Sequence, residues 1–215
     1  MERRFRIVER CWVGGLIGLS LLYVIGLIAV KWPRYWAYIA SEMTPMTWWE
    51  SIILFSCSMS AFLCAALIYV DSGLSRRVYI WCTLAAAFFF LTLDERFALH
   101  ERVRDNWLEP RNIKLLPWVG AGDFLLLLYA VVGILFLRYV LHELRIRKAA
   151  MRWFLVAVFI AALTVIMDSF DVSRMSLAME RLEQTVEEIL ELGAMLAFLV
   201  SFSLTASALV RQLVK

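Results

Sequence analysis

The sequence predicts an all-α integral membrane protein, a bundle of six transmembrane helices with both termini in the cytoplasm. Hydrophobic residues make up 62% of the 215-residue chain. They gather in continuous runs of roughly 20 residues, the length that crosses a bilayer as a helix. The runs lack the alternation of barrel strands, which excludes a membrane β-barrel. No linker divides the chain, so we expect residues 1–215 to form a single transmembrane domain.

Six apolar runs define the expected spans. The first run is too long for the core of a signal peptide and no small-residue cleavage site follows it, so we expect it to be retained. The connections are short, so neighbouring spans should pack as antiparallel hairpins. Glycines in the first span and serines in the second would allow close helix approach. The expected spans are 11–30, 48–70, 77–98, 120–141, 152–170 and 185–210.

The basic residues set the expected orientation. Most of the 22 lysines and arginines, but few of the 19 acids, lie in the first tail, the 2–3 and 4–5 loops and the C-terminus. Basic residues favour the cytoplasmic side. This places both termini inside, in a membrane that we take to be the bacterial inner membrane, with the opposite face towards the periplasm or exterior.

Acidic side chains gather at the expected outer ends of the spans. Charged groups inside a membrane usually face a bundle interior or an aqueous cavity, and they mark functional sites. We therefore expect spans two to six to bring these groups into one layer. Its members are Glu50, Asp94, Glu95, Asp123, Asp168, Asp171, Glu187, Glu188 and Glu191.

The string Leu93-Asp94-Glu95-x4-His100-Glu101 ends the third span. In a straight helix Asp94 and Glu101 share a face but stand about 10 Å apart along the axis. His100 then points about 120° away from Asp94. A site shared by Asp94 and His100 therefore requires a break in the helix after Glu95, or ligands from other helices.

Pairs of acids at helical spacing predict a metal site. Asp168 and Asp171 at i and i+3, and Glu187 and Glu191 at i and i+4, each share a helix face. Helical bundles build metal sites from such inward-facing pairs. This hard ligand set suits Mg, Ca, Mn or Fe, and catalytic Zn is also compatible. The predicted ligands are Asp94, His100, Asp168, Asp171, Glu187 and Glu191.

Three functions are compatible with the acidic layer. The first is metal-dependent hydrolysis of a lipid or lipid-linked substrate, with Glu95 and Asp94 as the catalytic carboxylates. The second is transport, with the acids as a cation or proton relay. The third is a structural or assembly role, with the acids neutralised by ion pairs to nearby arginines such as Arg96, Arg104 and Arg174.

Two other interpretations concern single elements. Glu50 and Asp123 are consistent with ordinary acids at helix N-termini, stabilised by the helix dipole. An amphipathic stretch, residues 172–186, either lies on the membrane or begins the sixth span early. The expected partners are the lipid bilayer and a lipid-linked substrate. The basic residues are explained by topology, so the sequence offers no support for nucleic-acid binding.

The Leu93-Asp94-Glu95-x4-His100-Glu101 string and a later Glu187-Glu188-x2-Glu191-x-Gly193 string resemble a group of uncharacterised bacterial polytopic membrane proteins. A looser similarity, on Asp94, is to the membrane hydrolase superfamily of alkaline ceramidases and progestin/adipoQ-type receptors. That similarity implies a bundle of six or seven spans with a polar site near one face. This chain departs from the superfamily where zinc-binding histidines are expected, because Glu187 and Glu191 stand at the late histidine pair. Ala86, Ala87 and Phe88 occupy the earlier histidine position.

Overall fold

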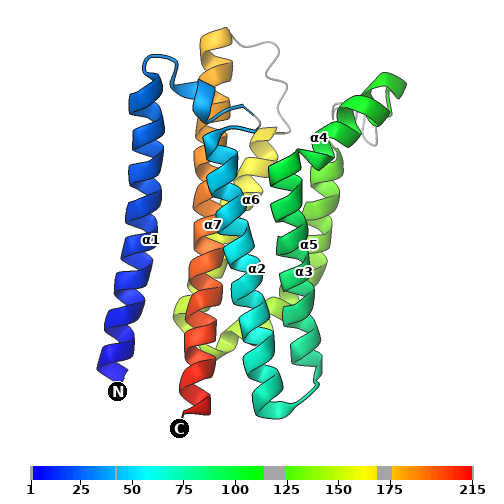
Figure 1. Cartoon of the computed structure of the whole chain (residues 1–215). Helices are drawn as coiled ribbons and strands as arrows, with labels where there is room; N and C mark the ends of the chain where they lie inside the picture. Colours follow the sequence, from blue (N-terminus) through cyan, green and yellow to red (C-terminus); the bar gives the residue numbers. More distant parts are fainter. Residues whose placement is uncertain (1, 42, 114–123, 169–175, 215) are drawn as a thin grey trace.

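The computed structural model describes residues 2–41, 43–113, 124–168 and 176–214. This part of the chain contains seven α-helices, and six of them are long and apolar enough to cross a membrane. The all-α fold and the number of candidate spans are therefore confirmed. Both termini lie at the same end of the bundle (Figure 1). We call this end the terminal end, and the opposite end the far end.

The six long helices coincide with the six expected spans. Short 3-10 or π segments, η1 to η4, occur in the connections. Helix α7 begins well before residue 185, so part of the amphipathic stretch opens the sixth span early. The helices are α1 Glu2–Lys31, α2 Pro45–Ser72, α3 Arg76–Phe97, α4 Leu99–Val103, α5 Phe124–Glu143, α6 Lys148–Asp168 and α7 Leu177–Leu213. The short segments are η1 Tyr35–Tyr38, η2 Arg104–Leu108, η3 Glu109–Arg111 and η4 Leu144–Ile146.

Local signals explain both ends of α2. Thr44 precedes the helix and forms a reciprocal capping box with Thr47, while Pro45 occupies the first helical position. Proline is favoured there because its missing N–H would have no partner within the helix. At the other end Gly73 adopts a φ of 69° and donates its N–H to the Tyr69 carbonyl at 2.8 Å. A left-handed residue that closes a helix in this way is usually glycine.

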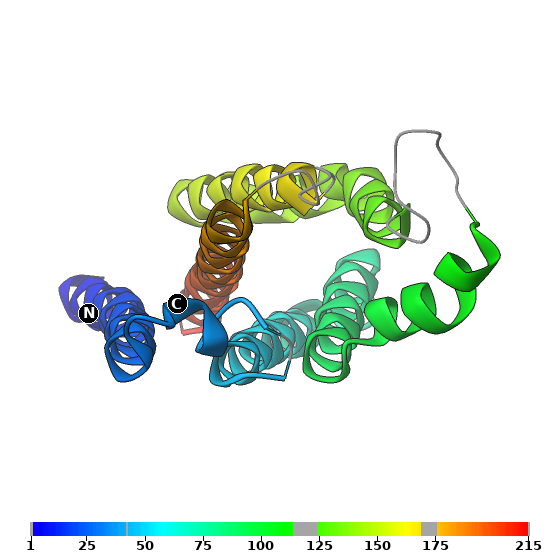
Figure 2. The same cartoon turned by 90° about the horizontal axis from the view of Figure 1, so that it is seen from above.

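The core of the bundle lies where α7 packs against α2 on one side and α6 on the other. The α2–α3 hairpin forms one wall and the α6–α7 pair the other (Figure 2). Phe202 of α7 is fully buried and meets Phe88 and Trp81 of α3 edge to face, at centroid distances of 5.2 and 5.6 Å. Phe198, one turn earlier, meets Phe154 of α6 at 5.4 Å. These rings join three helices in the middle of the bundle.

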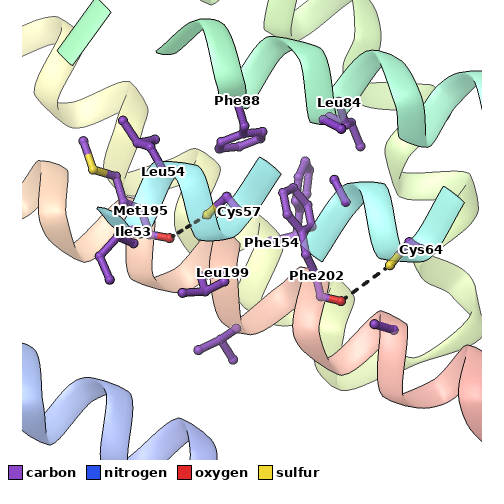
Figure 3. Packing of buried hydrophobic residues seen from close by; sticks show 14 of the residues in the cluster. Ile53, Leu54, Cys57, Cys64, Leu84, Phe88, Phe154, Met195, Leu199 and Phe202 are labelled. Carbon is purple, nitrogen blue, oxygen red and sulfur yellow. Dashed lines mark hydrogen bonds between the residues drawn. The ribbon is translucent and has the colours of Figure 1, made fainter. Parts of the chain in front are cut away.

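Small polar side chains hold the core helices close together. Cys57 and Cys64 of α2 donate to backbone carbonyls of α7, at Met195 (3.5 Å) and Phe202 (3.7 Å), as Figure 3 shows. Ser58 of α2 donates to the Ala85 carbonyl of α3 at 2.8 Å. Small residues at such positions let helix backbones approach closely in a membrane. The serine prediction for the second span is thus confirmed at Ser58.

Helix α1 lies at the edge of the bundle (Figure 2), and its Val24 and Leu27 are buried against the core. Near the far end Tyr23 stacks on Trp49 at 5.1 Å and donates its hydroxyl to the Pro45 carbonyl at 2.7 Å. Within the described residues the expected close packing at Gly14, Gly15 and Gly18 is not found, because a Cβ added at any of them would meet nothing within 4 Å. The residues of α1 that contact the core, such as Val13 and Leu16, lie on another face of the helix.

Arginines neutralise acids at the terminal end. Glu9 of α1 accepts hydrogen bonds from Arg147 (2.6 Å to Oε2), Arg211 and Ser207, which ties α1 to α7 and to the turn before α6. Arg77 of α3 bonds Glu143 of α5 at 2.7 Å, and the Glu143 side chain is only 3% exposed. Ion pairs therefore connect the helices at this end.

Candidate functional site

A break in the helix brings Asp94 and His100 together. Helix α3 ends at Phe97, Ala98 adopts the left-handed conformation (φ 47°, ψ 49°), and α4 begins at Leu99. Asp94 Oδ1 accepts the His100 backbone N–H at 2.8 Å, and Oδ2 lies 2.9 Å from His100 Nδ1. The sequence indicated that a shared site would need such a break. The structure confirms that these two predicted site residues are in contact.

Asp94 is buried, with 4% of the residue exposed. Within the described part of the chain its ion-pair partner is His100, and no arginine pairs with it. Arg104, a candidate counter-charge, instead bonds Glu101 at 3.2 Å and Asp105 at 2.8 Å. Tyr129 of α5 lies within electrostatic range of the Asp94 carboxylate. The pair is thus enclosed between α3, α4 and α5.

Glu50 of α2 is the most deeply buried acid among the described residues, with an exposed fraction of 0%. Neither of its carboxyl oxygens has a hydrogen-bond partner of standard geometry. Its acidic neighbours are Glu95 of α3, close enough for a weak contact, and Glu188 and Glu191 of α7. We call these four residues the glutamate cluster.

The position of Glu50 corrects the expectation that it is an ordinary acid at a helix N-terminus. Helix α2 begins at Pro45, so Glu50 lies beyond the first turn. Both α3 and α7 pack against α2, and they enclose the side chain. An unpaired buried carboxyl is unfavourable. Its presence here therefore needs a reason other than helix stability.

The structure joins some of the predicted residues and leaves others apart. Glu95 and Glu191 belong to the glutamate cluster, whereas Asp94 and His100 bind each other. Glu187 is half-buried on α7 and interacts with other residues of the chain. Asp123, Asp171 and the side chain of Asp168 lie outside the described residues. Within the described residues no three histidine, cysteine or acidic groups have an arrangement ready to hold a metal ion.

Glu50 and Glu188 were expected in the acidic layer but were not among the predicted ligands or catalytic residues. Glu188 stands at i and i+3 with Glu191, a spacing that shares a helix face just as the predicted Glu187 and Glu191 do. The signal for Glu50 was its place at the start of a long apolar run, two residues inside the expected span. An acid inside such a run faces the bundle interior more often than water.

The closeness of the carboxyl groups in the glutamate cluster limits the charge that the cluster can carry. Carboxyl groups that share one site cannot all be ionised without compensation. They are stabilised by a proton or by a cation that the carboxylates coordinate. Oxygen ligands of this kind select hard cations such as Mg²⁺, Ca²⁺ or Mn²⁺. A shared proton and a hard cation are thus the two ways in which the charge of the cluster can be compensated.

The six candidate spans, together with acids buried at one end, define a polytopic membrane protein. Residues 12–206 match a domain of unknown function, DUF8692, and the chain belongs to that family. Neither the curated proteins nor the solved structures provide a match. The family has no assigned activity, in line with the resemblance to uncharacterised membrane proteins. The looser similarity to the membrane hydrolase superfamily stays a prediction.

Proposed function

We propose that this protein is a metal-dependent membrane hydrolase. In this proposal the glutamate cluster would hold a divalent metal ion. The ion would supply the Lewis acid needed to activate water for cleavage of a lipid or lipid-linked substrate. The observation that carries the proposal is Glu50, which is fully buried among other glutamates and has no hydrogen-bond partner of standard geometry. A carboxylate in this position is explained if it coordinates a cation. Structural acids are normally paired, as Glu143 is with Arg77.

Each part of the site has a role in this reaction. Glu50, Glu95, Glu188 and Glu191 supply oxygen ligands from α2, α3 and α7. A bound divalent metal lowers the pKa of its water, and a nearby group that accepts a proton completes the activation. Asp94 was predicted both as a ligand and as a catalytic carboxylate, and His100 as a ligand. They bind each other, and we assign both to proton transfer. Asp168, Asp171 and Glu187 remain predicted ligands that would complete the coordination.

Metal analysis tests the proposal directly. The wild-type protein, purified in detergent without chelator, is expected to retain about one divalent ion per chain, measured by elemental mass spectrometry. Glu50→Gln is expected to abolish retention, because it removes the innermost ligand, and so is the double change Asp168→Asn with Glu191→Gln. Glu109→Gln is the matched control, since Glu109 is exposed on η3. Absence of metal from wild type, or metal retained by Glu50→Gln, would overturn the proposal.

A cation or proton relay is the second candidate function. It is favoured by the lack of a ready metal-holding group among the described residues. A relay needs carboxyls that exchange protons, and the buried Glu50 with the half-buried glutamates beside it supplies them. Proteoliposomes with an internal pH dye separate the two functions. A relay predicts proton or cation flux that Glu50→Gln abolishes, whereas a hydrolase predicts none.

We also propose that the far end of the bundle faces the exterior of an inner membrane. The basic residues at the terminal end support this orientation. In a cysteine-free background, Ser41→Cys and Pro110→Cys should react with an impermeant maleimide in intact cells. Leu74→Cys and Arg145→Cys should react only after permeabilisation. The reverse pattern would place the acids on the cytoplasmic side.

A further inference from the structure

The Asp94–His100 pair has a more specific arrangement than a simple ion pair. The two carboxylate oxygens of Asp94 contact two different groups of His100. One accepts the backbone N–H, and the other lies beside the ring Nδ1. The ring is therefore held at two points relative to Asp94. The His100 side chain is 23% exposed, while the Asp94 side chain is 6% exposed. A buried acid thus orients a histidine that water can reach.

The direction of the hydrogen bond determines the chemistry of the ring. A neutral imidazole carries one proton, and the nitrogen without the proton is the basic one. When Nδ1–H donates to a carboxylate, the lone pair is on Nε2. This is how a buried aspartate sets the tautomer of a catalytic histidine in hydrolases of unrelated folds.

We propose that Asp94 is a positioning residue that fixes His100 as the Nδ1–H tautomer, and that His100 Nε2 is the general base of the proposed hydrolysis. Nε2 takes a proton from water as the water oxygen bonds to the electrophilic centre of the substrate. The imidazolium then returns that proton to the leaving oxygen as its bond breaks. This assignment rests on the proposed function, and it extends it to the group that moves the proton.

The left-handed conformation of Ala98 indicates that the helix break does more than end α3. Alanine is the best helix former, and a non-glycine residue in this conformation is uncommon. A helix that continued past Phe97 would carry His100 away from Asp94. The break is thus the local feature that allows the two side chains to meet. Backbone conformations of this kind persist where the surrounding structure requires them, and they cluster at functional sites.

Asp94→Asn is the sharpest variant for a test. The asparagine amide oxygen can still accept the His100 backbone N–H, so the helix break is retained. Its NH₂ group then faces Nδ1 and donates to it, which moves the ring proton to Nε2. The substitution therefore changes the tautomer while it keeps the structural bond. Glu101→Gln is the matched control, because Glu101 bonds Arg104.

The chain has 2 histidines, His100 and His142. In a His142→Gln background, ¹⁵N-histidine labelling therefore reports on His100 alone. In detergent at about pH 8, the background protein and Glu101→Gln should show a protonated Nδ1 and the downfield signal of an unprotonated Nε2. Asp94→Asn should lose that signal and show a protonated Nε2. Circular dichroism would confirm that each variant retains its helices.

Three outcomes would overturn the inference. They are a protonated Nε2 in the background protein, the same tautomer in Asp94→Asn, and a ring protonated on both nitrogens. The tautomer does not depend on metal, so its result is separable from that of the proposed function. If Glu50→Gln loses metal but keeps the Nδ1–H tautomer, the two sites are both supported and distinct. If wild type holds no metal yet shows the tautomer, only the proposed function fails.

Discussion

At the terminal end, Glu9 and Glu143 lie against arginines, so their charges are compensated by neighbouring helices. At the far end, Glu50 faces other glutamates, and Asp94 faces a histidine. Both ends lie in one bundle and use the same type of side chain. Among the buried acids of the described chain, Glu143 pairs with an arginine and Asp94 with a histidine, whereas Glu50 lies among other acids, against the rule that buried acids are paired.

This difference separates two uses of a buried acid. A paired acid contributes to helix packing, and removal of its partner leaves an uncompensated charge. An acid among other acids contributes repulsion, and proteins retain such strain where function requires it. Removal of the partner of Glu143 and neutralisation of Glu50 should therefore change stability in opposite directions.

The largest expected effect is at the terminal end. Arg77→Met keeps an apolar stem but leaves the Glu143 carboxylate buried without its partner. The Arg77 side chain is 42% exposed, so the loss should lie at or below the lower end of the about 3–5 kcal/mol that breaking a fully buried pair costs. The thermal midpoint in detergent should still fall clearly. Arg145→Met, at an exposed arginine of the same end, should change little. A further Glu143→Gln change in the Arg77→Met protein should restore part of the loss, and additive effects would contradict the pairing.

Glu50→Gln is the corresponding change at the far end. In chelator we expect unchanged stability or a gain of about 0.5–2 kcal/mol, because one of several repelling carboxyls is neutralised. Wild type should gain about 2.7 kcal/mol from a divalent metal at 100 times its dissociation constant, and the variant should not. Differential scanning fluorimetry with and without metal measures both effects. A large destabilisation of Glu50→Gln in chelator would show that Glu50 has a structural role.

Asp94→Asn should have a smaller effect. One neutral hydrogen bond replaces a charge-assisted one, for a loss of about 1 kcal/mol. Because Asp94 binds His100 and is not assigned as a ligand, stabilisation by metal should persist in this variant. Its loss would instead support the sequence-based prediction that Asp94 is a ligand.

The bundle was predictable because its signals are local. Each span is a continuous apolar run, and length alone identifies it as a membrane helix. The approach of Glu50, Glu95, Glu188 and Glu191 also agrees with the expected layer of acids, since the short loops place successive span ends at the same height. The sequence does not show which face of each helix points into the bundle. Glu50 appeared to be an N-terminal acid, and only the packing of α3 and α7 against α2 shows that it is enclosed.

The helix break at Ala98 shows a second limit. The geometry of a straight helix required a break for Asp94 and His100 to meet, but no glycine or proline in residues 94–100 marks where it falls. Tertiary contacts therefore override the helix propensity of alanine. The glycines of α1 led to a wrong prediction of the opposite kind, a contact that was expected but is not found among the described residues. They suggested helix contacts, but their face meets nothing within the described chain.

The smallest expected effect concerns that glycine face. Gly18→Ala adds a methyl group where nothing lies within 4 Å, and alanine is favoured over glycine inside a helix by about 0.5–1 kcal/mol. We therefore expect a slightly higher thermal midpoint and an unchanged oligomeric state by size-exclusion chromatography with light scattering. Gly73→Ala is the contrasting control, because Gly73 also has open space but a φ of 69°, which costs an alanine about 1–2 kcal/mol. If Gly18→Ala instead lowers stability or shifts the oligomeric state, another helix packs on this face in the membrane. Helix α1 would then be an interface as well as the outermost span of the bundle.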